Sequence, residues 1–206
     1  YIKDKYRIEV EHFCATDQNG EKITYEKIFY STFQKGIMKG QMYGFPHRLG
    51  AWCNSRLKMK ARSKGCEKGD VSYVGIAYDE KKRHKILNEK AVAPLVDFCI
   101  DEDLCGLHCK YEGILSPSYN YSYRDGCWFC HNQALGELRN LRNKHPQLWE
   151  LLLKWDKDSR TPFKADGHTV HDYDLRFQLE DEGLILPDKP FRWDMLEKPL
   201  QYSMMF

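Results

Sequence analysis

The stretch Ser-Pro-Ser-Tyr-Asn-Tyr-Ser-Tyr-Arg-Asp-Gly-Cys-Trp-Phe-Cys, residues 116–130, is the most informative part of this sequence. It ends in Cys127 and Cys130, two thiols that are separated by two aromatic residues and preceded directly by a glycine. Two thiolates at this spacing on a tight turn can bind one metal ion or one iron–sulfur cluster. Further thiols that could complete such a site lie upstream, at Cys53, Cys105 and Cys109.

The composition is that of a globular chain. Its 206 residues are 42% hydrophobic, which is enough for the packed core of one domain, or of one domain with a helical extension. A net charge of +2 is too small to mark a dedicated nucleic-acid binder. No apolar run approaches the roughly 18 residues of a membrane span, and residues 1–5 are too charged for a secretory signal. Because eight dispersed cysteines favour a metal site or free thiols over a disulfide framework, we expect a cytoplasmic protein.

Hydrophobic periodicity predicts an α/β fold with a parallel sheet. Residues 71–78 form a continuous apolar segment of the kind found in buried parallel strands, and residues 91–96 form a shorter one. Residues 6–13 alternate between apolar and polar, which is typical of a half-buried strand. We expect Asp79 to cap a helix that follows the first of these apolar segments. Residues 75–83 would then lie at the carboxyl edge of the sheet, where α/β folds bind ligands.

A basic helix is expected at residues 51–62. Cys53 would lie in its first turn, where the helix dipole favours a thiolate. From His47 to Lys64 the sequence contains six basic residues and no acidic one. Two interpretations stay open: a functional thiolate beside a basic surface, or a solvated basic helix face with a buried cysteine.

A second pair of thiols lies on a helix that Asp101 is expected to cap. Cys105 and Cys109 are one turn apart and share a face of that helix. They are either ligands directed toward the turn at Cys127 or two small thiols of the core. The other three cysteines have no partner at ligand spacing and are expected to be structural: Cys14, Cys66 and Cys99. Apolar periodicity predicts further helices at residues 25–33, at residues 133–143, from Pro146 onward and at residues 171–181.

Four stretches carry a family resemblance. They are Gly-Phe-Pro (44–46) followed by Trp-Cys-Asn-x-x-Leu-Lys (52–58), Gly-Ile-Ala-x-Asp-Glu-x-x-Arg (75–83), Pro-Leu-Val-Asp (94–97), and Ser-Pro-x-Tyr with Arg-x-Gly-Cys-Trp-x-Cys (116–130). In order and spacing they resemble the phosphoadenosine phosphosulfate (PAPS) reductase family of the adenine-nucleotide α-hydrolase, or PP-loop, superfamily, and most closely its phage- and mobile-element-associated branch. The resemblance implies a parallel-sheet core in residues 1–100, a helical cysteine-rich metal or cluster subdomain in residues 101–158 and a C-terminal extension in residues 159–206.

Two features of that family are missing from this sequence. The ATP-binding signature Ser-Gly-Gly-x-Asp-Ser does not occur, and we expect it to lie upstream of Tyr1, so that the chain looks like the C-terminal two-thirds of the family's domain. Without this loop we expect weak nucleotide binding. No cysteine follows Cys130, so the C-terminal Glu-Cys-Gly-Leu-His redox motif of thiol-dependent PAPS reductases is absent. The similar letters at residues 104–108 precede the Cys-x-x-Cys pair and lack the glutamate, and we interpret them as a coincidence.

The resemblance also implies a ligand set. A [4Fe–4S] cluster would be bound by Cys53, Cys127 and Cys130, with Cys109 as the expected fourth ligand and Cys105 as its alternative. A structural zinc ion at the same thiols is the other candidate, because thiolates suit both. The substrate anion is expected to contact four basic residues: Arg56, Lys58, Arg83 and Arg124. The nucleotide is expected at the edge of the sheet formed by Gly75, Asp79 and Glu80.

Three functions stay open, and no catalytic residue is assigned. The one we favour is a PAPS reductase-like oxidoreductase or sulfurtransferase of sulfur metabolism, acting on an adenylylated or sulfonucleotide substrate beside the cluster. The second is thiolation or another modification of DNA or tRNA, which the basic run motivates. The third is a non-catalytic, zinc-stapled module that docks on a partner. The expected partners are therefore a sulfonucleotide or adenine nucleotide, DNA or tRNA in the second case, and a second copy of the chain in a homodimer, with no membrane.

Overall fold

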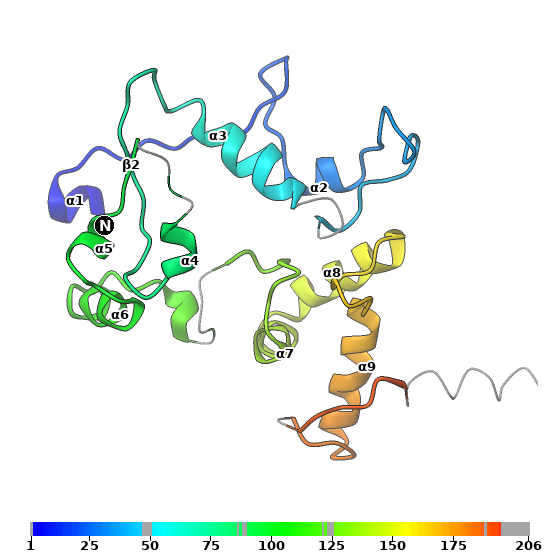
Figure 1. Ribbon diagram of the computed structural model, residues 1–206. Coiled ribbons are helices and arrows are strands. Elements are labelled where there is room, and N and C mark those ends of the chain that lie inside the picture. Colours follow the sequence, from blue (N-terminus) through cyan, green and yellow to red (C-terminus); the bar gives the residue numbers. More distant parts are fainter. Residues whose placement is uncertain are drawn as a thin grey trace, which may run out of the picture. The chain divides into compact units, whose positions relative to one another are not determined.

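The computed structural model describes residues 2–46, 51–85, 87, 90–120, 122, 126–187 and 189–194 (Figure 1). The chain divides into two compact units, each made from two separate segments of the sequence. Unit 1 comprises Tyr1–Thr24 and Asn54–Asp125, and unit 2 comprises Tyr25–Cys53 and Gly126–Phe206. The described part is mixed α/β and mostly helical, with a small parallel sheet. None of its helices is both long and apolar enough to cross a membrane. The division at residues 100 and 158 stays a prediction.

Unit 1 is built from short elements. Its sheet pairs β1 (Ser72–Tyr73) in parallel with β2 (Ala91–Val92). The helices of unit 1 are α1 (Ile2–Tyr6), the π-helix η2 (Asn54–Met59) that continues into α3 (Lys60–Arg62), α4 (Lys81–His84), α5 (Pro94–Asp97), α6 (Glu102–Tyr111) and the 3-10 helix η3 (Pro117–Asn120). The basic helix expected at residues 51–62 is therefore present, with a wider π-helical turn in most of its length.

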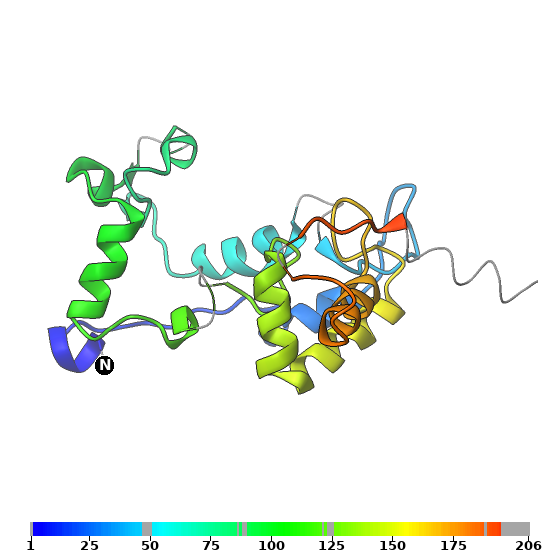
Figure 2. The same ribbon diagram turned by 90° about the horizontal axis from the view of Figure 1, so that it is seen from below.

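Helix α6, shown along its length in Figure 2, begins as the sequence predicts. The carboxylate of Asp101 accepts a hydrogen bond from the backbone N–H of Leu104 at 2.8 Å. This bond satisfies one of the amide donors that a helix leaves open in its first turn. Asp79 accepts a second amide, that of Glu102, at 3.2 Å. Gly113, with a φ of 68°, supplies the left-handed residue that commonly follows a helix end.

The strand predictions for unit 1 are largely wrong. Residues 7–13 form neither helix nor strand, and the side chains of Ile8, Val10 and Phe13 are exposed. Their alternation creates an apolar edge, but a strand needs a partner for its backbone groups, and the described sheet contains only β1 and β2. Of residues 71–78 only Ser72–Tyr73 is a strand, and Tyr73 is 76% exposed instead of buried.

Local backbone chemistry explains two element boundaries in unit 1 that differ from the predictions. Pro94 lacks the N–H that a strand ladder requires, so the strand predicted at residues 91–96 ends at Val92 and α5 begins at the proline. Helix α4 begins at Lys81 with Glu80 as its N-cap residue, and not with Asp79. Asp79 is instead engaged at the start of α6.

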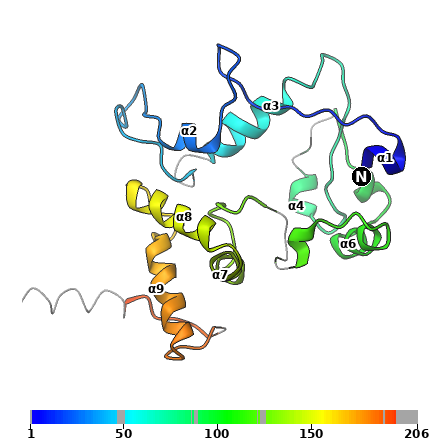
Figure 3. The ribbon, with the colours of Figure 1, turned by 180° about the vertical axis from the view of Figure 1, so that it is seen from behind.

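Unit 2 contains the four helices that its periodicity predicts, with small shifts at their ends: α2 (Tyr25–Phe29), α7 (Leu135–Lys144), α8 (Pro146–Asp158) and α9 (Val170–Asp181). Helix α8 packs against both α7 and α9, as Figure 3 shows from behind. Pro146 is the first residue of α8, where its missing N–H removes no helical bond. Thr169 and Asp172 cap α9 reciprocally, through bonds of 3.1 and 2.8 Å. Helix α2 is shorter than predicted, since it ends at Phe29.

The large buried side chains lie in unit 2. The fully buried ones are Phe29, Phe45, Phe163, Phe177, Leu138, Leu152 and Val170. Among the residues of unit 1 that the structure describes, the buried hydrophobic ones are Ile76 and three alanines, at positions 15, 77 and 93. Because a fully buried large apolar side chain contributes about 1.5–3 kcal/mol, hydrophobic burial stabilises unit 2 more than unit 1.

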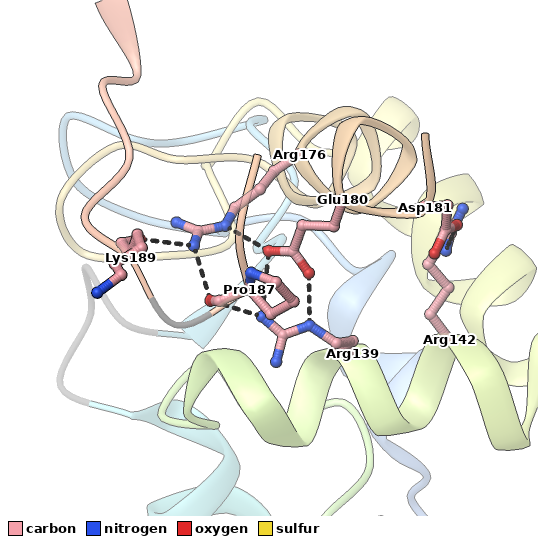
Figure 4. Close-up of polar contacts among 7 residues, drawn as sticks. All are labelled: Arg139, Arg142, Arg176, Glu180, Asp181, Pro187 and Lys189. Atoms are coloured by element: carbon pink, nitrogen blue, oxygen red, sulfur yellow. Dashed lines mark hydrogen bonds and ion pairs between the residues drawn. The ribbon is translucent and has the colours of Figure 1, made fainter. Parts of the chain in front are cut away.

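A buried charge network joins α7 to α9 (Figure 4). The carboxylate of Glu180, whose side chain is 4% exposed, contacts Arg139 at 2.5 Å and Arg176 at 3.0 Å. Both guanidinium groups also donate to the carbonyl oxygen of Pro187, which ties the segment after α9 to the helices. Burial acts to raise the pKa of Glu180, but the hydrogen bonds from the two arginines outweigh it, and the pKa lies below its ordinary value of 4.5.

This depressed pKa predicts an acid-sensitive contribution to stability. The folded state favours the charged carboxylate, so the contribution is present above the unfolded-state pKa and is lost as pH falls through the folded-state pKa. We expect Glu180→Gln to lower the free energy of unfolding at neutral pH by about 3 kcal/mol, because the buried Arg176 and the half-buried Arg139 lose their counter-charge. Urea denaturation followed by circular dichroism between roughly pH 3 and pH 7 measures both effects.

The matched control is Glu182→Gln, at an exposed glutamate just after α9. It should leave both the stability and its pH dependence unchanged. The assignment to Glu180 fails if Glu180→Gln loses stability with acid as steeply as the unaltered chain does.

Candidate functional site

An aromatic cluster in unit 2 forms the frame of the candidate site. The ring of Tyr25, the first residue of α2, lies 4.8 Å from Trp52, 4.1 Å from Phe129 and 5.3 Å from Trp155, measured between ring centroids. Trp128 stacks on Trp155 at 5.3 Å. Aromatic rings at these separations attract one another beyond the gain from burial alone. The five rings therefore hold the backbone segments that carry them close together.

This aromatic frame positions three of the predicted ligands. Cys53 directly follows one ring of the frame, and Cys127 and Cys130 flank two others. Burial raises the pKa of the Tyr25 hydroxyl, and electrostatic interactions with the thiols of Cys53, Cys130 and Cys127 raise it further. The contacts of the Tyr25 ring with Trp52 and Phe129 bring the neighbouring residues Cys53 and Cys130 toward the same part of unit 2. The structure thus brings Cys53, from before the basic helix, to the Cys-x-x-Cys turn.

The Cys-x-x-Cys turn is held by its own hydrogen bonds. The backbone N–H of Cys130 donates to the carbonyl oxygen of Cys127 at 2.9 Å. The backbone N–H of Gln133 donates to the carbonyl oxygen of Cys130 at 3.1 Å, and the side-chain amide of Gln133 donates to the carbonyl oxygen of Cys127 at 3.3 Å. Lys164 in turn donates to the carbonyl oxygen of Gln133. Because both cysteine carbonyls have donors, the turn has a defined shape before anything binds to its sulfurs.

The thiols themselves are half-buried, and none of the eight cysteines is in a disulfide. Within the part of the chain that the structure describes, no group of three or more His, Cys, Asp or Glu side chains is close enough to hold a metal ion. Cys53, Cys127 and Cys130 therefore do not form a closed metal site in this conformation. Their donor set nevertheless fits a soft metal centre, since all three are sulfurs.

The other two candidate ligands, Cys105 and Cys109, lie on α6 in unit 1. They line a cavity of about 960 Å³ together with Asp79, Glu102 and Tyr119. Burial raises the pKa of the Cys105 thiol, and its neighbour Cys109 and nearby carboxylates raise it further. A thiol in acidic surroundings stays protonated and is a poor nucleophile. This environment argues against a redox role for Cys105 in the sequence Leu-Cys-Gly-Leu-His (104–108).

Two residues that were expected to contact the substrate bind each other instead. Arg83 forms an ion pair with Glu80 at 2.6 Å, and this contact lowers the pKa of Glu80. The second carboxylate oxygen of Glu80 accepts the backbone N–H of Ala77 at 3.2 Å. Arg83, predicted to bind the anion, and Glu80, predicted to lie at the nucleotide edge, are therefore neighbours in unit 1. In this conformation the two side chains are paired with each other.

The remaining predicted residues of the anion and nucleotide sites lie at the surface of unit 1 or outside the described residues. Arg56 and Lys58 are exposed on η2. Gly75 is exposed and lines a second cavity of about 560 Å³ with Arg62 and Tyr73. Arg124, the fourth predicted anion contact, is outside the described residues.

Sequence reasoning missed two features of unit 2. Tyr25 is visible in the sequence only as an apolar position of a helix, because nothing in the periodicity separates a buried phenol from a buried phenyl ring. The second is a hydrogen bond in which the ring nitrogen Nδ1 of His171 lies 2.6 Å from a carboxylate oxygen of Asp156. The carboxylate is 3% exposed and the imidazole 54% exposed, an arrangement that orients a histidine toward solvent. No sequence pattern pairs these positions.

Comparison of the chain with protein-family models, with curated proteins and with solved structures finds no match. The PAPS reductase resemblance stays a prediction, as do the activity and the cofactor that it implies.

The arrangement of the thiols predicts their order of reaction with iodoacetamide. In the reduced, chelator-treated native chain, the exposed thiols of Cys14, Cys66 and Cys99 should be alkylated fastest. The half-buried Cys127 and Cys130 should react more slowly, by about tenfold or more, because the turn and the rings limit access. Peptide mass spectrometry of timed samples measures each site.

The control for this experiment is the same labelling in concentrated urea, where all eight sites should react at similar rates. Equal labelling of Cys127 and Cys66 in the native chain would show that the turn does not shelter its sulfurs.

Proposed function

We propose that this chain is a PAPS reductase-like oxidoreductase or sulfurtransferase of sulfur metabolism. It would act on an adenylylated or sulfonucleotide substrate with the help of a cysteine-bound [4Fe–4S] cluster. The observation that carries this proposal is the packing of Tyr25 against both Trp52 and Phe129, which brings the segment of Cys53 to the Cys-x-x-Cys turn in unit 2. The resemblance names the same three residues as ligands, and they come from segments that are far apart in the sequence.

Iron–sulfur ligation suits these thiols better than a single zinc ion. Zinc draws four donors to one point, whereas a four-iron cluster takes one thiolate at each iron and keeps its ligands further apart. The resemblance implies a cluster at these thiols, and we follow it in choosing between the two. The fourth ligand would come from α6, with Cys109 as our choice and Cys105 as the alternative. None of the eight cysteines is in a disulfide, which supports a reducing, cytoplasmic setting.

The protein's own residues would support the chemistry in three ways. The aromatic frame excludes water from one side of the thiols, since Tyr25, Trp52 and Trp155 are buried. The exposed Arg56 and Lys58 would bind sulfate or phosphate oxygens. A bound cluster would supply electrons, or a binding position for sulfur, next to the substrate. We further propose that β1 and β2 belong to a PP-loop-type parallel sheet, which their parallel pairing supports.

The first test is a metal analysis after anaerobic purification. We expect absorbance near roughly 400 nm and about four iron and four sulfide per chain. Cys53→Ser, Cys127→Ser and Cys130→Ser should each lose most of the iron, because each removes a ligand. The matched control is Cys66→Ser, which changes an exposed thiol with no assigned role and should retain the full iron content.

The fourth ligand is assigned by comparing Cys109→Ser with Cys105→Ser in the same assay. Only the ligand's replacement should lower the iron content. One zinc and no iron in the unaltered chain would contradict the cluster and would favour a zinc-stapled binding module.

The basic helix supports a second candidate function, the modification of DNA or tRNA. All the basic side chains of η2 and α3 are exposed: Arg56, Lys58, Lys60 and Arg62. Arg62 donates to the hydroxyl of Ser72 at 2.5 Å, and Lys64 donates to that of Thr16 at 2.6 Å, so these two cations contact neutral groups. A row of exposed cations without acidic neighbours in the sequence can contact a phosphate backbone.

This second candidate predicts salt-dependent binding of DNA or tRNA. The logarithm of the association constant should fall linearly with the logarithm of salt concentration. The double variant Lys58→Glu, Lys60→Glu should weaken binding and reduce that slope by about 2, since each lost phosphate contact removes about one released counterion. Fluorescence anisotropy with labelled duplex DNA and tRNA measures the slope.

A double variant with the same charge change, Lys154→Glu with Lys157→Glu, serves as the control. These two lysines are exposed on α8 in unit 2. The nucleic-acid reading is wrong if neither DNA nor tRNA binds at low salt, or if both double variants have the same effect.

A further inference from the structure

A carboxylate–imidazole pair links α8 to α9 in unit 2. The ring nitrogen Nδ1 of His171 lies 2.6 Å from the carboxylate oxygen Oδ2 of Asp156, and the backbone N–H of His171 donates to the same oxygen at 3.2 Å. The side chain of Asp156 is 3% exposed, whereas the imidazole is 54% exposed. One buried carboxylate therefore fixes both the ring and the backbone of a histidine that solvent can reach.

This hydrogen bond gives the two nitrogens of the His171 ring different roles. An ionised carboxylate can only accept hydrogen bonds, so Nδ1 carries the proton that it shares with Asp156. In the neutral ring the other nitrogen, Nε2, then holds the free lone pair. Because Nδ1 faces the buried carboxylate, Nε2 is the nitrogen on the accessible edge of the ring. The folded chain thus presents a basic nitrogen to solvent in one fixed tautomer.

The second carboxylate oxygen of Asp156, Oδ1, is buried and has no hydrogen-bond partner in the described part of the chain. Buried polar atoms nearly always have a partner, so this one calls for a physical explanation. A positive charge on the adjacent imidazole provides one, because a nearby cation favours the charged form of a buried carboxylate. The pair therefore suits a reaction in which the imidazole ring becomes cationic.

Attack of Nε2 on an electrophile is such a reaction. Histidine acts as a nucleophile in group transfer, and a new bond at Nε2 leaves the ring cationic while Nδ1 keeps its proton. The place of His171 in the fold favours a phosphoryl group, since it is the second residue of the 12-residue helix α9. The positive end of the helix dipole stabilises phosphoryl oxygens. The neighbouring carboxylate of Asp172 is bonded to the backbone N–H of Thr169 at 2.8 Å.

We propose that Nε2 of His171 is a phosphoryl-accepting nucleophile, which Asp156 positions and activates. The donor is of the phosphoramidate class, in which phosphorus is bonded to a protonated nitrogen. The Nε2 lone pair forms the bond to phosphorus, and the P–N bond of the donor breaks. Its electron pair leaves with the nitrogen as a neutral amine that already carries its protons. The phosphorylated ring is an imidazolium whose Nδ1–H stays bonded to Asp156. This site uses no cysteine and does not rest on the proposed function.

The test is incubation of the native full chain with potassium phosphoramidate. Peptide mass spectrometry of timed samples measures the rate at each histidine, and phosphorus NMR distinguishes the Nδ1 isomer from the Nε2 isomer. The internal controls are His12 and His84, two exposed histidines of unit 1. No ion pair or hydrogen bond within the described residues joins either ring to a carboxylate.

We expect His171 to be phosphorylated about tenfold faster than His12 and His84, and at Nε2 alone, because Asp156 activates the ring and occupies Nδ1. In concentrated urea, where the bond to Asp156 is lost, the three histidines should react at similar rates and give both isomers.

The variant Asp156→Asn tests the carboxylate. An amide can still accept the hydrogen bond from Nδ1, but it has no charge to stabilise the cationic ring, so the rate at His171 should fall about tenfold. The matched control is Asp158→Asn, at the exposed aspartate of α8 that accepts the hydrogen bond of the Tyr30 hydroxyl at 2.6 Å. It should leave the rate at His171 unchanged.

Three results overturn the inference. The first is a rate at His171 in the native chain that is no higher than the rates at His12 and His84. The second is a phosphoryl group on Nδ1 of His171, because that nitrogen would then be free of Asp156. The third is a folded Asp156→Asn variant that reacts as fast as the unaltered chain. If Asp156→Asn does not fold, the rate and the isomer measured at His171 of the unaltered chain decide.

Discussion

The stacking of Tyr25 on rings from two distant segments is the contact on which the candidate site depends. Trp52 and Phe129 are far apart in the sequence, and closing a loop of that length costs conformational entropy that local contacts cannot offset. Large flat side chains offset that cost well, because they bury much area while losing few rotatable bonds. Every cysteine of unit 2 adjoins one of these rings in the sequence, so the placement of the sulfurs follows from the packing of the aromatic core.

The two units give their thiols opposite environments. Around Tyr25 the side chains next to Cys53, Cys127 and Cys130 in the sequence are aromatic rings packed on one another. On α6 the neighbours of Cys105 include the carboxylates of Asp101, Asp79 and Glu102, which oppose a thiolate. A cation would relieve that opposition, since it would interact favourably with sulfur and carboxylate together. On α6 a positive charge brought by a ligand would therefore favour the ionised form of the Cys105 thiol.

How far the sequence predicts the structure depends on how local the signal is. The helices of unit 2 are predictable because Pro146, Thr169 and the apolar periodicity act within one or two turns. The strands of unit 1 are not predictable in this way. The alternation at residues 6–13 specifies which side chains share a face but not which strand would pair with them. In the second apolar segment, Pro94 has no N–H to donate to a neighbouring strand, so the strand ends before it. Cysteine spacing indicates the Cys127 turn. It cannot indicate Tyr25, whose role comes from neighbours that only the folded chain brings together.

The segment after α9 is held to the helices through its backbone carbonyl oxygens and not through its side chains. Arg139 and Arg176 donate to the carbonyl oxygen of Pro187, and Arg176 also donates to that of Lys189 at 3.4 Å. Every residue type carries such a carbonyl group. The amino acids at these two positions can therefore vary during evolution while the path of the segment persists. The side chains that hold the segment on that path are the two arginines on the helices, which Glu180 orients.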